Sequence, residues 1–257
     1  MDDTTNRFKQ ALAEGRTQIG LWSSLCSNIA AEIVSGSGFD WIVVDLEHAP
    51  NDIASLTMQL QAMKGGTATP VVRPYWNDMP LFKRILDAGA QSLICPYVQN
   101  AEEAAQAVSQ ARYPLAGVRG VASSHRGNQW GRDQGYFERA NKEMCVLAQL
   151  ETAEAVAELE KIAAVDGIDG VFVGPSDLSA SLGHIGRPND KPVQDAIADF
   201  VARARKIGKP AGILTGSVAD AHRYLEMGFT FVAVGNDATA LRVASDNLAK
   251  EFAKYRN

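Results

Sequence analysis

Short, mostly apolar runs alternate with longer amphipathic runs along the chain. The short runs lack the regular polar–apolar alternation of a strand with one exposed face, so they favour parallel strands covered on both faces. Eight such runs are present, at Ile19–Trp22, Trp41–Leu46, Pro70–Arg73, Ser92–Pro96, Val146–Leu150, Gly170–Val173, Ala211–Leu214 and Phe231–Val234.

Helical patterns separate most of these runs. Glu102–Ala111 is rich in alanine and follows Asn100, which can cap the first turn. Thr152–Ala163 places its apolar residues on one face, and Val218–Met227 stops at Gly228, a common residue at a helix end. The chain therefore repeats a strand–helix unit.

Eight strand–helix units in 257 residues are typical of a single TIM (β/α)8-barrel domain, here spanning residues 1–257. A doubly wound open sheet is the alternative, but the glycine-rich turn of a dinucleotide site is missing. One long connection, Arg112–Lys142, is expected to be a functional or mobile loop.

Composition narrows the function. With 46% hydrophobic residues and a formal net charge of −5, the chain can bury a large core and offers no basic footprint for nucleic acid. No apolar run approaches the roughly 20 residues of a membrane helix, and the polar start lacks a secretory signal. Cys26, Cys95 and Cys145 have no zinc-site spacing and are expected to be core residues in a reducing compartment. We therefore expect a cytoplasmic protein.

Two acidic residues follow consecutive strand-like runs. Glu151 comes directly after Val146–Leu150, and Asp177 follows Gly170–Val173. The carboxyl ends of parallel barrel strands meet at one rim, so the two carboxylates should converge there. Two such oxygen ligands suit Mg²⁺ or Mn²⁺, with water or substrate in the other positions. Alternatively, each acid caps the helix that follows it.

Other polar residues end strands at the same predicted rim. His48 can act as an acid or base, and Asp45 can orient it or a water; the alternatives are a structural histidine and a turn cap. Arg73 can bind a carboxylate or enolate oxygen of a substrate; alternatively, it forms an ion pair with a carboxylate at the protein surface. The turn Gly174–Asp177 can present backbone N–H groups to a substrate carboxylate, or be only a turn.

Four segments together resemble one known family. They are Asp45-Leu46-Glu47-His48, the isolated Arg73, Gln149-Leu150-Glu151-Thr152 and the run from Val173 to Gly183. These segments are similar to the HpcH/HpaI aldolases, which are class II, metal-dependent pyruvate aldolases. The resemblance extends from Gly20 to the last helix. It implies a carbon–carbon lyase that cleaves 4-hydroxy-2-oxo acids to pyruvate, or a related 2-oxo acid, and an aldehyde.

The resemblance also implies roles for individual residues. Glu151 and Asp177 would bind a divalent metal (Mg²⁺, Mn²⁺ or Co²⁺), and no organic cofactor is expected. His48 would be the acid/base group beside Asp45, and Arg73 would bind pyruvate. The remaining implied site residues are Gln149 and Trp22 lining the pocket, Ser176 and Leu214 facing the carboxylate through their backbones, and Asp87 pairing with His48 from its own or a neighbouring subunit.

Family members are usually hexamers, built as dimers of trimers that exchange the last helix. The segment from Asp237 suits such an exchange, because one helical stripe is apolar. That stripe consists of Leu241, Ala244, Leu248, Phe252 and Tyr255.

The sequence departs from the family pattern in the long loop. Pro114 is followed by Leu115, where the family often has a second proline, and Ser123–Asn128 differs from the segment expected in dicarboxylate-cleaving members. We expect this loop to contact the aldehyde half of the substrate, so the resemblance does not identify the aldehyde. Three other functions compete with this one. A citrate-lyase-β-like or malyl-CoA-lyase-like enzyme would need a basic CoA site, and a phosphoenolpyruvate-mutase-like or isocitrate-lyase-like enzyme would need motifs that are missing. The third alternative is a non-catalytic metal-binding barrel.

Overall fold

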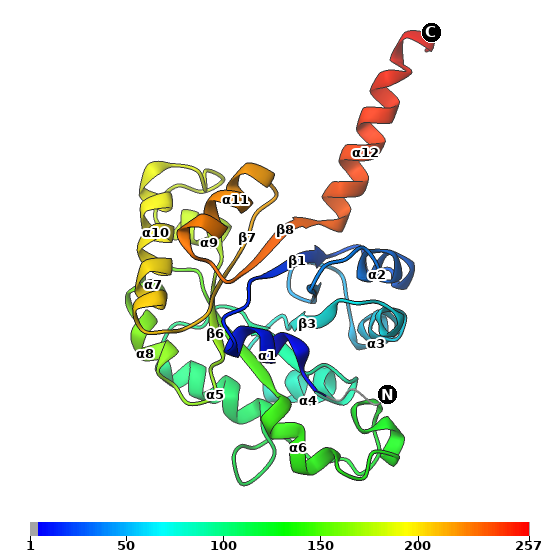
Figure 1. Cartoon of the computed structure of the whole chain (residues 1–257), viewed down its shortest axis with the longest axis vertical. Helices are drawn as coiled ribbons and strands as arrows, with labels where there is room; N and C mark the ends of the chain where they lie inside the picture. Colours follow the sequence, from blue (N-terminus) through cyan, green and yellow to red (C-terminus); the bar gives the residue numbers. More distant parts are fainter. Residues whose placement is uncertain (1–4, 257) are drawn as a thin grey trace.

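The computed structural model describes residues 5–256 and shows a closed barrel of eight parallel strands in sequence order (Figure 1). All eight predicted strands are confirmed, with ends that differ by at most two residues. They are β1 (Gln18–Ser23), β2 (Trp41–Asp45), β3 (Thr69–Arg73), β4 (Ser92–Cys95), β5 (Cys145–Leu150), β6 (Gly170–Val173), β7 (Ala211–Leu214) and β8 (Phe231–Asn236).

Helices follow the strands and cover the outside of the barrel (Figure 1). They are α1 (Arg7–Ala13), α2 (Asn28–Ser35), α3 (Ile53–Ala62), α4 (Met79–Asp87), α5 (Ala101–Ala111), α6 (Tyr136–Glu143), α7 (Ala153–Ala157), α8 (Leu159–Ala163), α9 (Pro175–Ser181), α10 (Lys191–Lys206), α11 (Val218–Met227) and α12 (Asp237–Glu251). Short 3-10 turns lie at Met63–Gly65, Arg126–Gly131 and Ala253–Tyr255.

Large aromatic side chains fill the barrel interior. Trp41 and Phe231 are fully buried, and Phe8 of α1 packs on both, with ring centroids 5.3 and 5.8 Å away. Two glycines leave room for these rings. A Cβ atom at Gly20 would lie 2.3 Å from Trp41, and one at Gly212 would lie 2.1 Å from Phe231. Helix α1 therefore closes the end of the barrel at which the strands begin.

Two sequence expectations about elements need correction. The predicted helix Thr152–Ala163 is two helices, because Glu158 (φ −90°, ψ 8°) leaves the helical conformation between α7 and α8. The predicted loop Arg112–Lys142 contains a 3-10 turn at Arg126–Gly131 and the start of α6. Cys95 and Cys145 are core residues as expected, but Cys26 is only half-buried, because it lies in the loop after β1.

Helix α12 projects away from the barrel (Figure 1). The predicted apolar stripe is exposed in the single chain, with Leu248 of α12 65% accessible and Tyr255 73% accessible; the helix ends at Glu251, so Phe252 and Tyr255 lie beyond it. Exchange of this helix between subunits stays a prediction. In the described part of the chain, every helix is too short or too polar to span a bilayer.

Candidate active site at the carboxyl-terminal rim

Neighbouring strands bring Asp45 and Arg73 together. The two residues are direct register partners on β2 and β3. Both are buried, and Arg73 forks onto the carboxylate: Nε lies 2.8 Å from Oδ1 and Nη2 lies 2.6 Å from Oδ2. Two parallel charge-assisted bonds are strong and fix the guanidinium plane. Burial raises the pKa of Asp45, but hydrogen bonds and the charge of Arg73 outweigh it, so the pKa lies below its ordinary value.

Trp22, on β1, completes this group from a third side. Its indole N–H donates to Asp45 Oδ2 at 3.2 Å, and the Arg73 guanidinium lies 4.8 Å from the centre of its ring. A guanidinium over an aromatic face is an attractive cation–π arrangement. The predicted Trp22, Asp45 and Arg73 therefore form one rigid assembly.

His48 lies at the mouth of the site rather than inside it. Asp45 Oδ1 accepts the backbone N–H groups of Glu47 (3.0 Å) and His48 (3.4 Å), so Asp45 does cap this turn. The contacts of Asp45 thus orient the backbone at His48 and not its ring, contrary to one sequence expectation. The imidazole is 64% exposed, with Nε2 3.9 Å from Glu47 Oε2. It can therefore reach a bound ligand from the solvent side.

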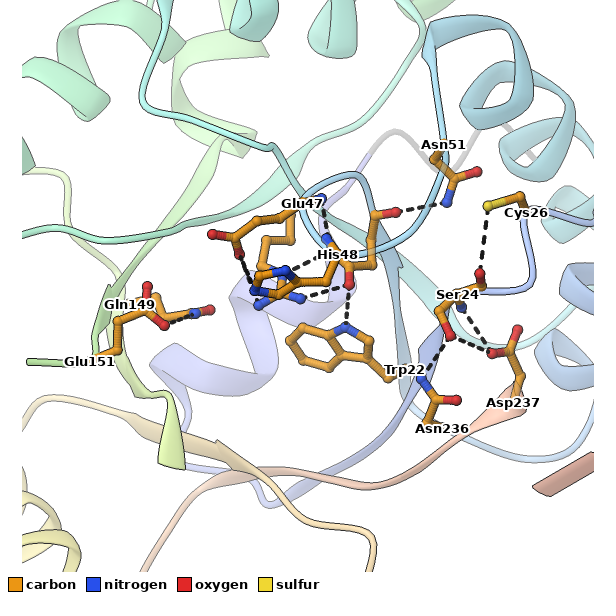
Figure 2. A network of polar contacts seen from close by, with 12 residues as sticks. Trp22, Ser24, Cys26, Glu47, His48, Asn51, Gln149, Glu151, Asn236 and Asp237 are labelled. Carbon is orange, nitrogen blue, oxygen red and sulfur yellow. Dashed lines mark hydrogen bonds and ion pairs between the residues drawn. The ribbon is translucent and has the colours of Figure 1, made fainter. Parts of the chain in front are cut away.

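Glu151 is buried just beyond β5 and is held by two donors. Oε1 accepts the backbone N–H of Tyr97 at 2.9 Å, and Oε2 accepts Gln149 Nε2 at 2.6 Å (Figure 2). Tyr97 has φ 54°, a left-handed conformation that is uncommon outside glycine, so sequence alone gave no sign of this donor. Burial, with smaller contributions from Glu47 and Asp177, raises the pKa of Glu151 to about 7 despite the bond from Gln149.

Gly174 allows the next strand to approach Glu151. A Cβ atom at this position would lie 2.6 Å from Glu151 Oε2. The chain then enters α9 at Pro175, which places Ser176 and Asp177 in its exposed first turn. Asp177 influences the pKa values of both Glu47 and Glu151, so the three carboxylates share one region of the rim.

Glu47 lies in the site, although the sequence did not predict a role for it. Burial raises its pKa to about 6; Arg73 lowers it, and Asp45 and Asp177 raise it. Its Oε2 lies 3.0 Å from Arg73 Nη1, yet this buried atom makes no hydrogen bond. Its only sequence signal was its place directly after a strand, where the rim residues gather. The contact with Arg73 places Glu47 beside the Asp45–Arg73 pair.

The donor set fits a hard divalent cation. Glu151 and Asp177 have carboxylate oxygens of the kind that such an ion binds, and Glu47 near them has a buried oxygen without a hydrogen bond. Carboxylates that raise one another's pKa are stabilised by a bound cation. Among residues 5–256, no three acidic, histidine or cysteine side chains already converge as a complete metal site.

Two other predicted residues lie elsewhere or at the margin. Asp87, at the end of α4, accepts a hydrogen bond from the buried Arg119 at 2.9 Å and lies 3.9 Å from His125. These partners, rather than His48, surround it in its own chain, so pairing with a neighbour's His48 stays a prediction. Leu214, at the end of β7, is half-buried against the barrel interior.

A closed parallel barrel with carboxylates, a buried arginine and an exposed histidine at its carboxyl-terminal rim defines the class as an α/β-barrel enzyme. The chain belongs to the HpcH/HpaI aldolase/citrate lyase family, whose sequence profile matches residues 18–244. It is a carbon–carbon lyase of the aldolase type, as its similarity to aldolases over nearly the full length shows.

Three comparisons illustrate this relationship. A 4-hydroxy-2-oxo-heptane-1,7-dioate aldolase of Klebsiella pneumoniae subsp. pneumoniae is 52% identical over 96% of this chain and 94% of the relative. A 5-keto-4-deoxy-D-glucarate aldolase of Enterobacter sp. (strain 638) is 50% identical over 97% of each chain. The crystal structure of an HpcH/HpaI aldolase/citrate lyase family protein from Burkholderia cenocepacia J2315 matches with a TM-score of 0.94 at 39% identity, covering 97% of this chain and 100% of that one.

Proposed function

We propose that this aldolase reversibly cleaves 4-hydroxy-2-oxo acids to pyruvate, or a related 2-oxo acid, and an aldehyde, with a divalent metal ion bound by Glu151 and Asp177. The observation that carries the proposal is the carboxylate group of Glu47, Glu151 and Asp177 beside Arg73 at one rim. The names of two relatives at 50% identity or more, both aldolases of oxo-dicarboxylates, support this substrate class.

A bound metal ion supplies Lewis-acid polarisation of the keto group and charge stabilisation of the enolate. Glu151 is prepared for binding by its two donors, which fix both carboxylate oxygens. Gln149 and Gly174 set the position of Oε2, one through a hydrogen bond and the other by leaving space. Mg²⁺, Mn²⁺ and Co²⁺ all accept such oxygen donors.

Arg73 binds and orients the 2-oxo acid. Its Nε and Nη2 are engaged by Asp45, whereas Nη1 has only an ion contact with Glu47. Nη1 is therefore the nitrogen that can donate to an oxygen of the pyruvate half. A fixed cation in this buried place stabilises negative charge that develops as the carbon–carbon bond breaks. Trp22 keeps the guanidinium in plane.

His48 moves the proton. Its exposed imidazole lies at the mouth, where the aldehyde half and C3 of pyruvate would meet. In the cleavage direction it accepts the proton of the 4-hydroxyl group as the C3–C4 bond breaks, and then gives that proton to C3 of the enolate to form pyruvate; in the reverse direction it takes a proton from C3 and returns it to the aldehyde oxygen as the new bond forms. When no aldehyde is bound, His48 would only remove a C3 proton from pyruvate and return it.

The assembly is proposed to be a hexamer, a dimer of trimers that exchanges α12, in the cytoplasm. The exposed apolar stripe of α12 supports exchange, and the three free cysteines suit a reducing compartment. Sedimentation equilibrium would test the assembly. A particle near six times 27.6 kDa is expected, whereas a stable monomer would contradict it.

The proposed chemistry is tested in two parts. Pyruvate in D₂O should lose its C3 proton signals when enzyme and Mg²⁺, Mn²⁺ or Co²⁺ are present, and chelation should stop the exchange. Cleavage of several 4-hydroxy-2-oxo acids, including the heptane-1,7-dioate and a glucarate-derived acid, should then identify the preferred aldehyde. Absence of exchange with every metal would overturn the proposed function.

A further inference from the structure

A buried carboxylate at the start of α12 binds the loop that follows β1. Asp237 is only 5% exposed. It accepts the Ser24 N–H at 2.9 Å, the Ser23 hydroxyl at 3.0 Å and the Leu25 N–H at 3.3 Å. Figure 2 shows Ser24 between Asp237 and Asn236, whose amide donates to the Ser24 hydroxyl at 2.8 Å. Two residues of one helix start therefore hold this loop.

Helix capping does not account for Asp237. Asn236 is already the N-cap of α12, and its side chain accepts the Thr239 N–H at 3.1 Å. Asp237 does take the N–H of Ala238, but its other bonds go to residues 23–25. A buried aspartate needs a reason beyond folding propensity, since this residue type is rarely buried.

The segment that Asp237 holds, residues 23–25, contains the last residue of β1 and the start of the following loop, and it comes directly after Trp22. Strand β1 shifts its register against β8 between Gly20 and Trp22, so the regular strand pairing is interrupted before the indole. Trp22 in turn contacts both members of the Asp45–Arg73 pair. The start of α12 is thus connected to the guanidinium of Arg73 by a chain of contacts. Asp237 binds residues 23–25, and the adjacent Trp22 contacts Arg73 through its ring.

We propose that Asp237 is a positioning residue for the aldolase site. It fixes residues 23–25 so that Trp22 stays against Asp45 and Arg73, and Arg73 then presents Nη1 to the 2-oxo acid. This inference rests on the proposed function. Small displacements of positioning groups are costly, because about 1 Å of misplacement can reduce a rate about a hundredfold.

The first test compares Asp237→Asn with Asp246→Asn. The control aspartate lies on the same helix, is exposed and pairs with Arg242 one turn away. Asp237→Asn keeps the shape but lacks one of the two acceptor oxygens, so kcat/KM for oxo-acid cleavage should fall about tenfold. The control should stay near wild type. A folded Asp237→Asn enzyme with unchanged kcat and KM would overturn the proposal.

A double-mutant cycle asks whether Asp237 acts through Trp22. In a Trp22→Phe background, Asp237→Asn should cause little further loss of kcat/KM, because the ring's bond to Asp45 is already missing. A loss that multiplies fully with that of Trp22→Phe would show that Asp237 acts independently, which contradicts the inference.

A spectroscopic readout separates this inference from the proposed function. In protein labelled with 5-fluorotryptophan, the ¹⁹F signal that disappears in Trp22→Phe belongs to Trp22. That signal should shift in Asp237→Asn and in Ser24→Ala, and stay in place in Asp246→Asn. An unmoved signal would overturn the positioning role. A moved signal in a protein without aldolase activity would overturn the proposed function only.

Discussion

The guanidinium of Arg73 is held on three sides, by Asp45, Glu47 and the ring of Trp22. Lysine at this position would keep the charge but lose the two-pronged contact with Asp45. We expect Arg73→Lys to lower kcat/KM about a hundredfold for every aldehyde partner, because the pyruvate half is common to all. Steady-state kinetics with several substrates measure this, with exposed Arg84→Lys as control. A loss confined to one aldehyde would place Arg73 in the other half of the site.

His48 is assigned to proton transfer and not to metal binding. His48→Ala should therefore lower kcat by roughly two to four orders of magnitude while metal affinity changes little. His222→Ala, at an exposed position on α11, is the control. Turnover, calorimetric metal affinity and melting temperature should be measured on the same preparations. A less stable protein with normal turnover would make His48 a structural residue.

Glu151 and Asp177 are the proposed metal ligands. Either Glu151→Ala or Asp177→Ala should abolish Mn²⁺ binding, because two protein oxygens are too few for one to be lost. Calorimetric titration measures the affinity, and Glu154→Ala, an exposed neighbour on α7, should bind normally. Unchanged metal affinity in both variants would show that Glu151 and Asp177 are not the metal ligands.

Single residues were predictable where strand position determines their place. Asp45, Arg73 and Glu151 end strands, so their meeting at one rim followed from topology. The Tyr97 N–H was not predictable, because a left-handed tyrosine leaves no mark in the sequence. Asp237 was predicted only as the start of the last helical segment, because its bonds to residues 23–25 join parts of the chain far apart in sequence.

At the scale of elements, the eight strands were predictable because each is apolar and buried on both faces. The break between α7 and α8 was not, since Glu158 carries no proline or glycine signal. Packing explains the result: Arg203 of α10 donates to the backbone carbonyls of Val156 and Ala157 at the end of α7. Tertiary contacts there replace the bonds that one continuous helix would make.

The same arginine joins α10 to α8 through Glu160, with N–O distances of 2.8 and 2.5 Å. Its hydrogen bonds lower the pKa of Glu160 to about 2. A folded-state pKa below the unfolded one gives stability that is complete above pH ~4.5 and lost as pH falls towards 2. Arg203→Met should therefore lower the melting temperature at pH 7. The difference from wild type should shrink between pH 4.5 and 2.5 in thermal scans, and a difference independent of pH would exclude this ion pair as its source.

At the scale of the whole molecule, the number of strand–helix units predicted a closed barrel with its polar residues gathered at one end. Contacts between subunits could not be predicted in this way. A sequence pattern can show that α12 has an apolar face, but the proposed partner surface is not part of the single chain, in which this face is exposed. The aldehyde was not predictable either, because the loop Arg112–Lys142 departs from the family pattern.

Helix α1 and the ring of Phe8 close one end of the barrel, so both products have to leave by the entrance that the substrate used. Arg73, which is proposed to hold the pyruvate half, is buried, whereas His48, which is proposed to act on the aldehyde half, is exposed. The aldehyde should consequently depart first and pyruvate second. In cleavage assays pyruvate should then be a competitive inhibitor with respect to the oxo acid, and the aldehyde should be a non-competitive inhibitor. The opposite pattern would mean that pyruvate leaves before the aldehyde, by a separate route.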